Sequence, residues 1–238
     1  MTVYVDNWRQ HTAVPPGHIE TTDGVPVDLG RTGRLAARGE EPRPGGPPEP
    51  AAASRALDPG SPGEELIRET GAELFGPAEA VFDSARAYRY LLTRTWAPGQ
   101  PLVWLMLNPS TASAVADDPT IKRCAAFARR EGAGGIIVVN LFAYRATRPA
   151  DLARCPDPVG ELNDEFIRQA VSVPGRMVIV AWGAHGPLRG RAAQVTRMFS
   201  MEGIAVWCLG TTKTGQPVHP LYQPVGAKLI RYEALLSA

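Results

Sequence analysis

The chain has few cysteines, no long apolar run and almost no net charge. Its three cysteines, Cys124, Cys155 and Cys208, show no CxxC or Cys/His spacing, so they indicate neither a disulfide framework nor a structural zinc site. No apolar run is long enough to cross a bilayer. A net charge of +1 permits contact with nucleic acid but lacks the strong basic excess that is usual for duplex-binding proteins.

The N-terminal residues contain no basic patch followed by an apolar segment, so we expect no signal peptide and a cytoplasmic location. We expect no association with membranes, no metal ion and no cofactor. The motif Gly210-Thr211-Thr212-Lys213-Thr214-Gly215 lacks the spacing of a phosphate-binding loop, which argues against a nucleoside triphosphatase.

A length of 238 residues with 44% hydrophobic side chains suits one domain and an appendage. Residues 1–60 hold 9 of the 23 prolines and 8 of the 24 glycines. Such a segment buries too little apolar surface to offset its chain entropy, so we expect a disordered tail over 1–60 and one domain over 61–238.

Four short runs rich in Val, Ile and Leu are apolar on both faces, which is typical of interior parallel strands. They cover residues 101–107, 136–141, 177–182 and 204–209. Helical patterns alternate with them, at about 118–132, 160–173, 188–201 and 225–236. A short helix is predicted over 63–76, and a hairpin is predicted around Asp83-Ser84. The pattern favours a three-layer α/β/α fold with a central four-stranded parallel sheet and an N-terminal hairpin.

Unusual polar sequences follow all four predicted strands, and in such sheets ligands bind beyond the carboxyl ends of the strands. The candidate site residues are Asn108, Pro109, Ser110, Thr111, Asn140, Tyr144, Arg145, Gly183, Lys213, His219 and Tyr222, with Asp117, Asp118 and His185 as secondary candidates.

Each of these motifs also has a structural interpretation. Asn108-Pro109 is a common turn opener, and Asn140 is suited to the end of a strand. Asp117 and Asp118 are suited to the first turn of a helix, where carboxylates meet the helix dipole. A single histidine is most often a surface or core residue, although Pro217 and Pro220 hold His219 in a rigid loop.

The stretch from Tyr88 to Tyr222 resembles the domain of unknown function 1643 family of bacteria and phages. The shared motifs are Tyr88-Arg89-Tyr90, Met106 to Ala112, Asp117 to Thr120, Val139 to Thr147, Asn163-Asp164, Ala181-Trp182-Gly183 and His219 to Tyr222. They appear in order over more than half the chain, but the family name carries no activity.

The same motif order is more distantly similar to the uracil-DNA glycosylase superfamily. Leu107-Asn108-Pro109 resembles the Ile-Asn-Pro form of the mismatch-specific branch, and His219-Pro220 resembles the start of its His-Pro-Ser motif. Asn140 falls at the place of the asparagine that reads the base. Ser110 stands where that branch has Gly, and Leu221 stands where the histidine motif has Ser.

This resemblance implies an N-glycosidase that acts on a modified or mismatched base. In that mechanism Asn108 holds a water molecule, His219 donates a hydrogen bond to the base, and Asn140 reads the base edge. Tyr144 or Tyr222 stacks on the base, Arg145 and Lys213 contact phosphate, and Ser110 or Thr111 supports it. Two alternatives stay open, namely a non-catalytic nucleotide or nucleic-acid binding module and a glycosidase of free nucleosides or nucleotides.

Overall fold

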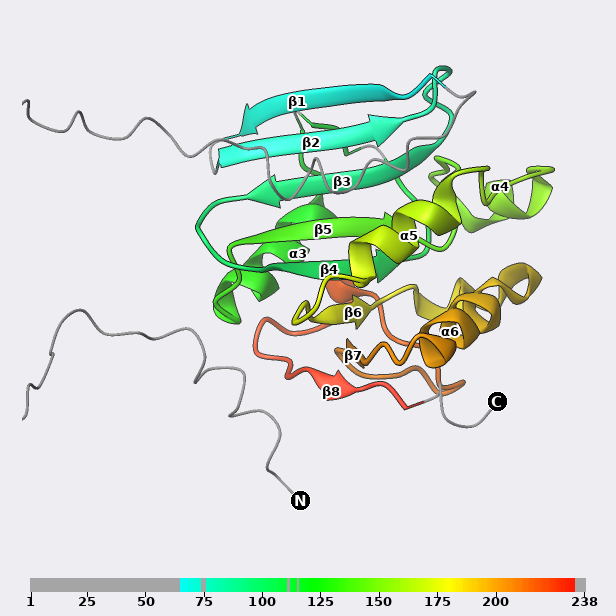
Figure 1. The fold of residues 1–238 in the computed structure, drawn as a ribbon. Helices are drawn as coiled ribbons and strands as arrows, with labels where there is room; N and C mark the ends of the chain where they lie inside the picture. Colours follow the sequence, from blue (N-terminus) through cyan, green and yellow to red (C-terminus); the bar gives the residue numbers. More distant parts are fainter. Residues whose placement is uncertain (1–64, 74–75, 111, 115, 234–238) are drawn as a thin grey trace, which may run out of the picture. The chain divides into compact units, whose positions relative to one another are not determined.

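A computed structural model of the chain describes residues 65–73, 76–110, 112–114 and 116–233. Within these residues one mixed sheet has eight strands in the order β1-β2-β3-β5-β4-β6-β7-β8 (Figure 1). The strands are β1 (Ile67–Glu73), β2 (Gly76–Phe82), β3 (Arg89–Thr95), β4 (Pro101–Met106), β5 (Gly135–Asn140), β6 (Val178–Val180), β7 (Val206–Cys208) and β8 (Ile230–Arg231). The helices are α3 (Pro119–Arg130), α4 (Pro149–Arg154), α5 (Asn163–Val171) and α6 (Arg191–Met201), with short 3₁₀ helices η1 (Gly183–His185), η2 (Leu188–Gly190) and η3 (Pro220–Tyr222).

The four predicted apolar runs form neighbouring parallel strands. Strand β4 pairs with β5 on one side and with β6 on the other, and β6 pairs with β7. The mixed α/β class is confirmed, but the sheet has eight strands and mixed direction, not four parallel strands. Antiparallel β1, β2 and β3 extend it beyond β5, and β8 extends it beyond β7. The predicted hairpin, formed by β2 and β3, is therefore part of the sheet, because β3 covers the edge of β5 that would otherwise be unpaired.

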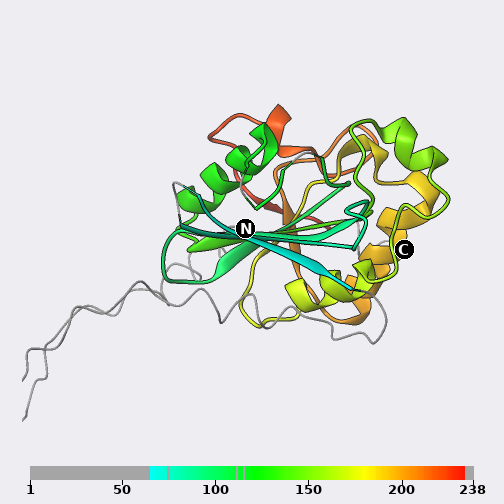
Figure 2. The same cartoon turned by 90° about the horizontal axis from the view of Figure 1, so that it is seen from above.

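Helices cover both faces of this sheet (Figure 2). On one face α3 packs through Ile121, Cys124 and Phe127 against Trp104 and Val138 of the sheet. On the other face α5 and α6 contribute a second cluster that includes Phe166, Ile167, Val195 and Phe199. The central strands alternate between these two clusters, which explains why their sequences are apolar throughout.

Helix α3 forms where the sequence predicts it. Asp118 is the N-cap and its side chain accepts a hydrogen bond from the Ile121 amide at 2.9 Å. Pro119 begins the helix, where the missing amide hydrogen is harmless. The buried stripe recurs at three- and four-residue spacing and fixes which face of α3 meets the sheet.

Two predicted helices are wrong. Where a helix was predicted over 63–76, Ile67–Glu73 is an edge strand whose backbone pairs with β2 from Ile67↔Phe82 to Glu73↔Gly76. Where a helix was predicted over 225–236, the chain forms a turn and then β8, which pairs with β7. In both segments backbone pairing with another strand, β2 directly after β1 and β7 before β8, overrides a local preference for helix. The short helix α4 was not predicted.

The predicted tail, residues 1–60, lies outside the described residues. Among the residues that are described, no helix has the length and apolar character needed to span a membrane.

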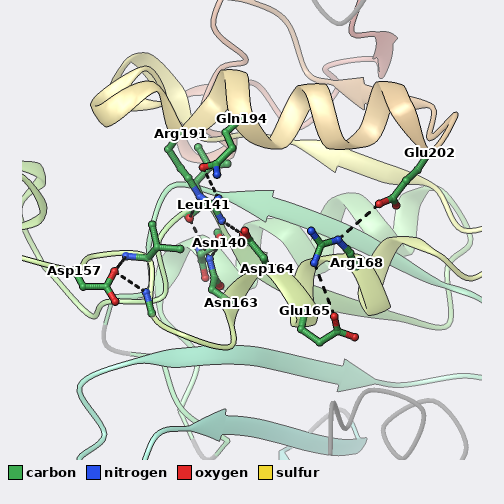
Figure 3. A network of polar contacts seen from close by, with 12 residues as sticks. Asn140, Leu141, Asp157, Asn163, Asp164, Glu165, Arg168, Arg191, Gln194 and Glu202 are labelled. Carbon is green, nitrogen blue, oxygen red and sulfur yellow. Dashed lines mark hydrogen bonds and ion pairs between the residues drawn. The ribbon is translucent and has the colours of Figure 1, made fainter. Parts of the chain in front are cut away.

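A buried polar network holds the end of β5 (Figure 3). The Asn163 side chain, which is fully buried, donates to the carbonyl oxygens of Asn140 and Leu141, each at 3.0 Å. Arg191 donates through Nε to the Leu141 carbonyl at 2.8 Å and pairs with Asp164. Asn163 and Asp164 begin α5 and Arg191 begins α6, so this network joins both helices to the point where β5 ends.

Replacing Asn163 with Ala should lower the free energy of unfolding by about 1–3 kcal/mol, because two buried carbonyl groups lose a donor. Chemical denaturation measures the change. The exposed Ser172→Ala, at the other end of α5, is the matched control and should change stability by less than about 0.5 kcal/mol. Equal stabilities of the two variants would contradict this role for Asn163.

Candidate functional site

The loops that follow the parallel strands meet at one edge of the sheet. Beyond β5, the amides of Leu141 and Phe142 donate to the carbonyl oxygens of Met106 and Leu107 at 2.8 and 2.9 Å. Beyond β6, the amide of Gly183 donates to the Pro217 carbonyl at 2.8 Å. A cavity of about 720 Å³ opens between these loops, which is the size of a typical small-molecule site. Of the predicted residues, it is lined by Asn108, Ser110, Asp118, Gly183, His185, His219 and Tyr222.

Asn108 presents one face of its amide to this cavity. Its Nδ2 donates to the Pro109 carbonyl at 2.9 Å and to the Ala146 carbonyl at 2.6 Å. Both hydrogens of the amide nitrogen are therefore engaged, and the orientation of the group is fixed. The side-chain oxygen is the atom left to accept a hydrogen bond from a ligand. Pro109 is buried and serves as part of this frame.

His219 is held in one protonation form. Its Nδ1 accepts a long hydrogen bond, 3.4 Å, from the Leu221 amide at the start of η3. Burial lowers the pKa of the imidazole below its ordinary value of 6.5, and the nearby Asp118 carboxylate opposes this shift. With its pKa below the ordinary value, the ring is mainly neutral at pH 7, and because Nδ1 is an acceptor, the proton of the neutral ring is on Nε2. His219 offers a neutral N–H donor.

Gly183 lies against His219. A side chain added at Gly183 would place its Cβ 3.9 Å from the His219 Cβ, and the backbone φ of +72° favours glycine. Tyr222 is 81% exposed, and its ring centre lies 5.7 Å from that of His219. The two rings therefore border the same side of the cavity, with Tyr222 open to solvent.

Two charged groups also line the cavity, of opposite sign. Asp118 uses one carboxylate oxygen to cap α3, as its structural interpretation predicts, and it is half-buried. Arg89, which is not among the predicted site residues, is only 2% exposed and lines the cavity. Burial lowers the pKa of its guanidinium to about 10, partly offset by Asp118. The available signal was an arginine between two tyrosines, Tyr88 and Tyr90, at the start of β3.

Other predicted residues lie outside this cavity. Tyr144 and Arg145 line an adjacent hollow of about 340 Å³ that shares Ser110, Ala146 and Thr147 with it. Lys213 is exposed and does not line either space. Asp117 forms an ion pair with Arg94 at 2.7 Å and borders a different cavity, of about 390 Å³. Thr111 is outside the described residues.

Asn140 is 1% exposed and is not among the residues that line the cavity. Met106, which pairs with Asn140 in the β4–β5 register, does line the cavity. Within the described part of the chain, neither polar atom of the Asn140 side-chain amide has a hydrogen-bond partner. The side chain predicted to read a base is thus buried in β5, at the register position of Met106, and does not line the cavity.

The cysteines lie away from the cavity lining. Cys124 and Cys208 are buried, and burial raises the pKa of both thiols, which opposes a role as nucleophile. Among the described residues, no group of three or more His, Cys, Asp or Glu side chains could hold a metal ion.

A protein-family model described as "Protein of unknown function (DUF1643)" matches residues 89–221, more than half of the chain. The chain belongs to the DUF1643 family. No curated protein matches the chain, and no solved structure matches it. The DUF1643 region begins at Arg89 and ends just after His219, so it contains every residue that lines the large cavity except Tyr222.

The lowered pKa of His219 predicts a pH-dependent contribution to stability. The unfolded chain binds the proton more readily, so this contribution is complete above pH 6.5 and is lost as the pH falls through the folded-state pKa. Denaturation of the wild type and His219→Gln from pH 8 to 5 measures it. The difference in unfolding free energy between the two should be constant above about pH 7 and should shrink below it. A difference that does not change with pH would contradict the neutral, half-buried imidazole.

Proposed function

We propose that the protein binds a modified or mismatched nucleobase in the large cavity and hydrolyses its N-glycosidic bond. The observation that carries the proposal is the pair formed by Asn108 and His219. Both line one cavity, and the bonds that they already make leave an acceptor on Asn108 and a donor on His219.

Hydrolysis of an N-glycosidic bond needs these two functions. Positive charge grows on the sugar and negative charge grows on the departing base. The Asn108 oxygen orients the attacking water, and His219 Nε2–H donates to a base oxygen as that oxygen becomes anionic. A neutral donor suits this step because it stabilises the charge without first transferring a proton.

Asp118, at the end of the loop after β4, supplies the carboxylate that the Asn108-Pro109 motif lacks. An amide is too weak a base to take a proton from water, so Asn108 alone provides positioning only. The Asp118 carboxylate lines the same cavity and has a second oxygen beyond the one that caps α3. In the proposed reaction the water oxygen bonds to the sugar carbon, the bond electrons leave with the base, and a water proton passes to Asp118.

We also propose that the parallel strands and their loops are related to the core of the uracil-DNA glycosylase superfamily. The support is the order of two motifs on the fold, Asn108-Pro109 after β4 and His219-Pro220 after β7. An Asn-Pro loop and a His-Pro loop occupy the same order in that superfamily.

A second candidate function is binding without cleavage, and the buried side chain of Asn140 and the weak basicity of Asn108 favour it. A third, a glycosidase of free nucleosides or nucleotides, is favoured by the net charge of only +1. Comparing oligonucleotide with nucleotide substrates at several salt concentrations separates the DNA-directed enzyme, since binding through phosphates weakens steeply with salt. Binding without base release at any enzyme concentration would establish the second.

The test is a base-release assay on single- and double-stranded DNA that carries uracil, hypoxanthine, thymine mismatches and modified bases, and on the free nucleosides and nucleotides. Asn108→Ala and His219→Ala should each lower release by about 100- to 1,000-fold with the fold retained. Asp118→Asn should lower it as well, whereas the exposed Arg197→Ala, away from the cavity, should not. No release from any substrate would refute the enzyme, and unchanged rates in the first two variants would refute these roles.

A further inference from the structure

Three arginines in the described part of the chain, Arg89, Arg94 and Arg191, are less than 5% exposed. They differ in their hydrogen-bond and ion-pair partners. Arg94 pairs with Asp117 and also donates to the carbonyl oxygens of Thr93 and Ser113. Arg191 pairs with Asp164 and also donates to Leu141 and Gln194. In each case a carboxylate balances the charge, and all three guanidinium nitrogens are engaged.

Arg89 has far fewer polar partners than Arg94 or Arg191. Its one hydrogen bond within the described residues runs from a terminal nitrogen to the Ala112 carbonyl at 2.8 Å. Its Nε is buried without a partner, and no carboxylate of the described residues lies within ion-pair distance. Arg89 is also the one of the three that lines the large cavity. A buried cation without a counter-charge is strongly unfavourable, so its presence at a cavity wall points to a charge supplied from outside the chain.

The charges around Arg89 also favour a negatively charged ligand. Asp118 is the acidic group that acts on it, whereas Arg145 and Arg94 act against its charge. Since Arg94 is already paired with Asp117, the remaining charges that act here are Arg89, Arg145 and Asp118, a formal excess of one positive charge. A negatively charged group placed there would meet the guanidinium group of Arg89 and the carboxylate of Asp118 in the cavity, with the guanidinium group of Arg145 in the adjacent hollow.

We propose that the ligand of the large cavity carries an anionic group, a carboxylate or a phosphate, and that Arg89 receives it. That the rest of the ligand is a nucleobase rests on the proposed function, whereas the anionic group rests on Arg89 alone. The substrate class is then an acidic base derivative or a nucleotide, rather than a neutral base or nucleoside. Guanidinium groups suit such a ligand because they bind planar or tetrahedral oxyanions with two parallel hydrogen bonds.

The first test is the stability of the free protein. Arg89→Met removes a charge that lacks a partner, so the Tm should equal or exceed that of the wild type. Arg191→Met breaks a buried pair and should lower the Tm by about 5–15 °C. If Arg89→Met lowers the Tm as much as Arg191→Met does, Arg89 is a structural residue and the proposal is overturned.

The second test is binding, measured by calorimetry on the full chain with matched pairs of probes. The pairs are uracil with uracil-6-carboxylate, and deoxyuridine with deoxyuridine 5′-monophosphate, with inorganic phosphate alone as a fifth probe. At least one anionic probe should bind ten-fold or more tightly than its neutral partner. Preference for the carboxylate places the anion on the base, and preference for the monophosphate places it on the sugar. The absence of any such preference, including a failure of every probe to bind, overturns the proposal.

Variants assign the preference to Arg89. Arg89→Met should abolish it, Arg89→Lys should keep part of it, and the exposed Arg197→Gln should keep all of it. A preference that survives in Arg89→Met overturns the proposal. The two proposals fail separately: an anionic preference lost in Arg89→Met without base release refutes the glycosidase alone, and release of neutral bases at the same rate by Arg89→Met refutes the anion receptor alone.

Discussion

The pairing of β4 between two parallel neighbours is the constraint on which the site depends. Because β5 and β6 run in the same direction as β4, their carboxyl ends reach one edge of the sheet together. The backbone bonds from Leu141 to Met106 and from Ala181 to Leu105, both 2.8 Å, continue this pairing just past the strands. The loop that carries Asn108 and the loop that carries His219 are thereby brought to one cavity across more than 100 residues of chain.

Buried polar and charged side chains around this edge of the sheet fall into two groups, one with hydrogen-bond partners and one largely without them. On one face of the sheet, Arg191 and Asn163 saturate the carbonyl groups at the end of β5 and fix the helices to it. Arg89 at the cavity wall and the amide of Asn140, which does not line the cavity, are buried with few or no partners among the described residues. The first arrangement adds stability and the second costs it, which is the pattern expected where a structure keeps polar groups ready for a ligand.

The sequence predicted the parallel strands and α3 well, because a run that is apolar on both faces and a capped amphipathic helix are local signals. It failed for β1 and β8, where the spacing of apolar residues favours a helix but the backbone pairs with β2, the next strand along the chain, and with β7. The motif residues Asn108 and His219 were found because each follows a predicted strand. Arg89 was missed, since its importance lies in the absence of a counter-charge, and the partners of a buried group cannot be read along the chain.

The central claim is that one ligand lies between Asn108 and His219. The most direct measurement is a crystal structure of the wild-type protein grown with the nucleotide or base that it binds most tightly. The account predicts a base oxygen within hydrogen-bond distance of His219 Nε2 and a water molecule on the Asn108 side-chain oxygen, on the sugar side. A base bound elsewhere on the protein, or bound in the cavity with neither residue in contact, would contradict it.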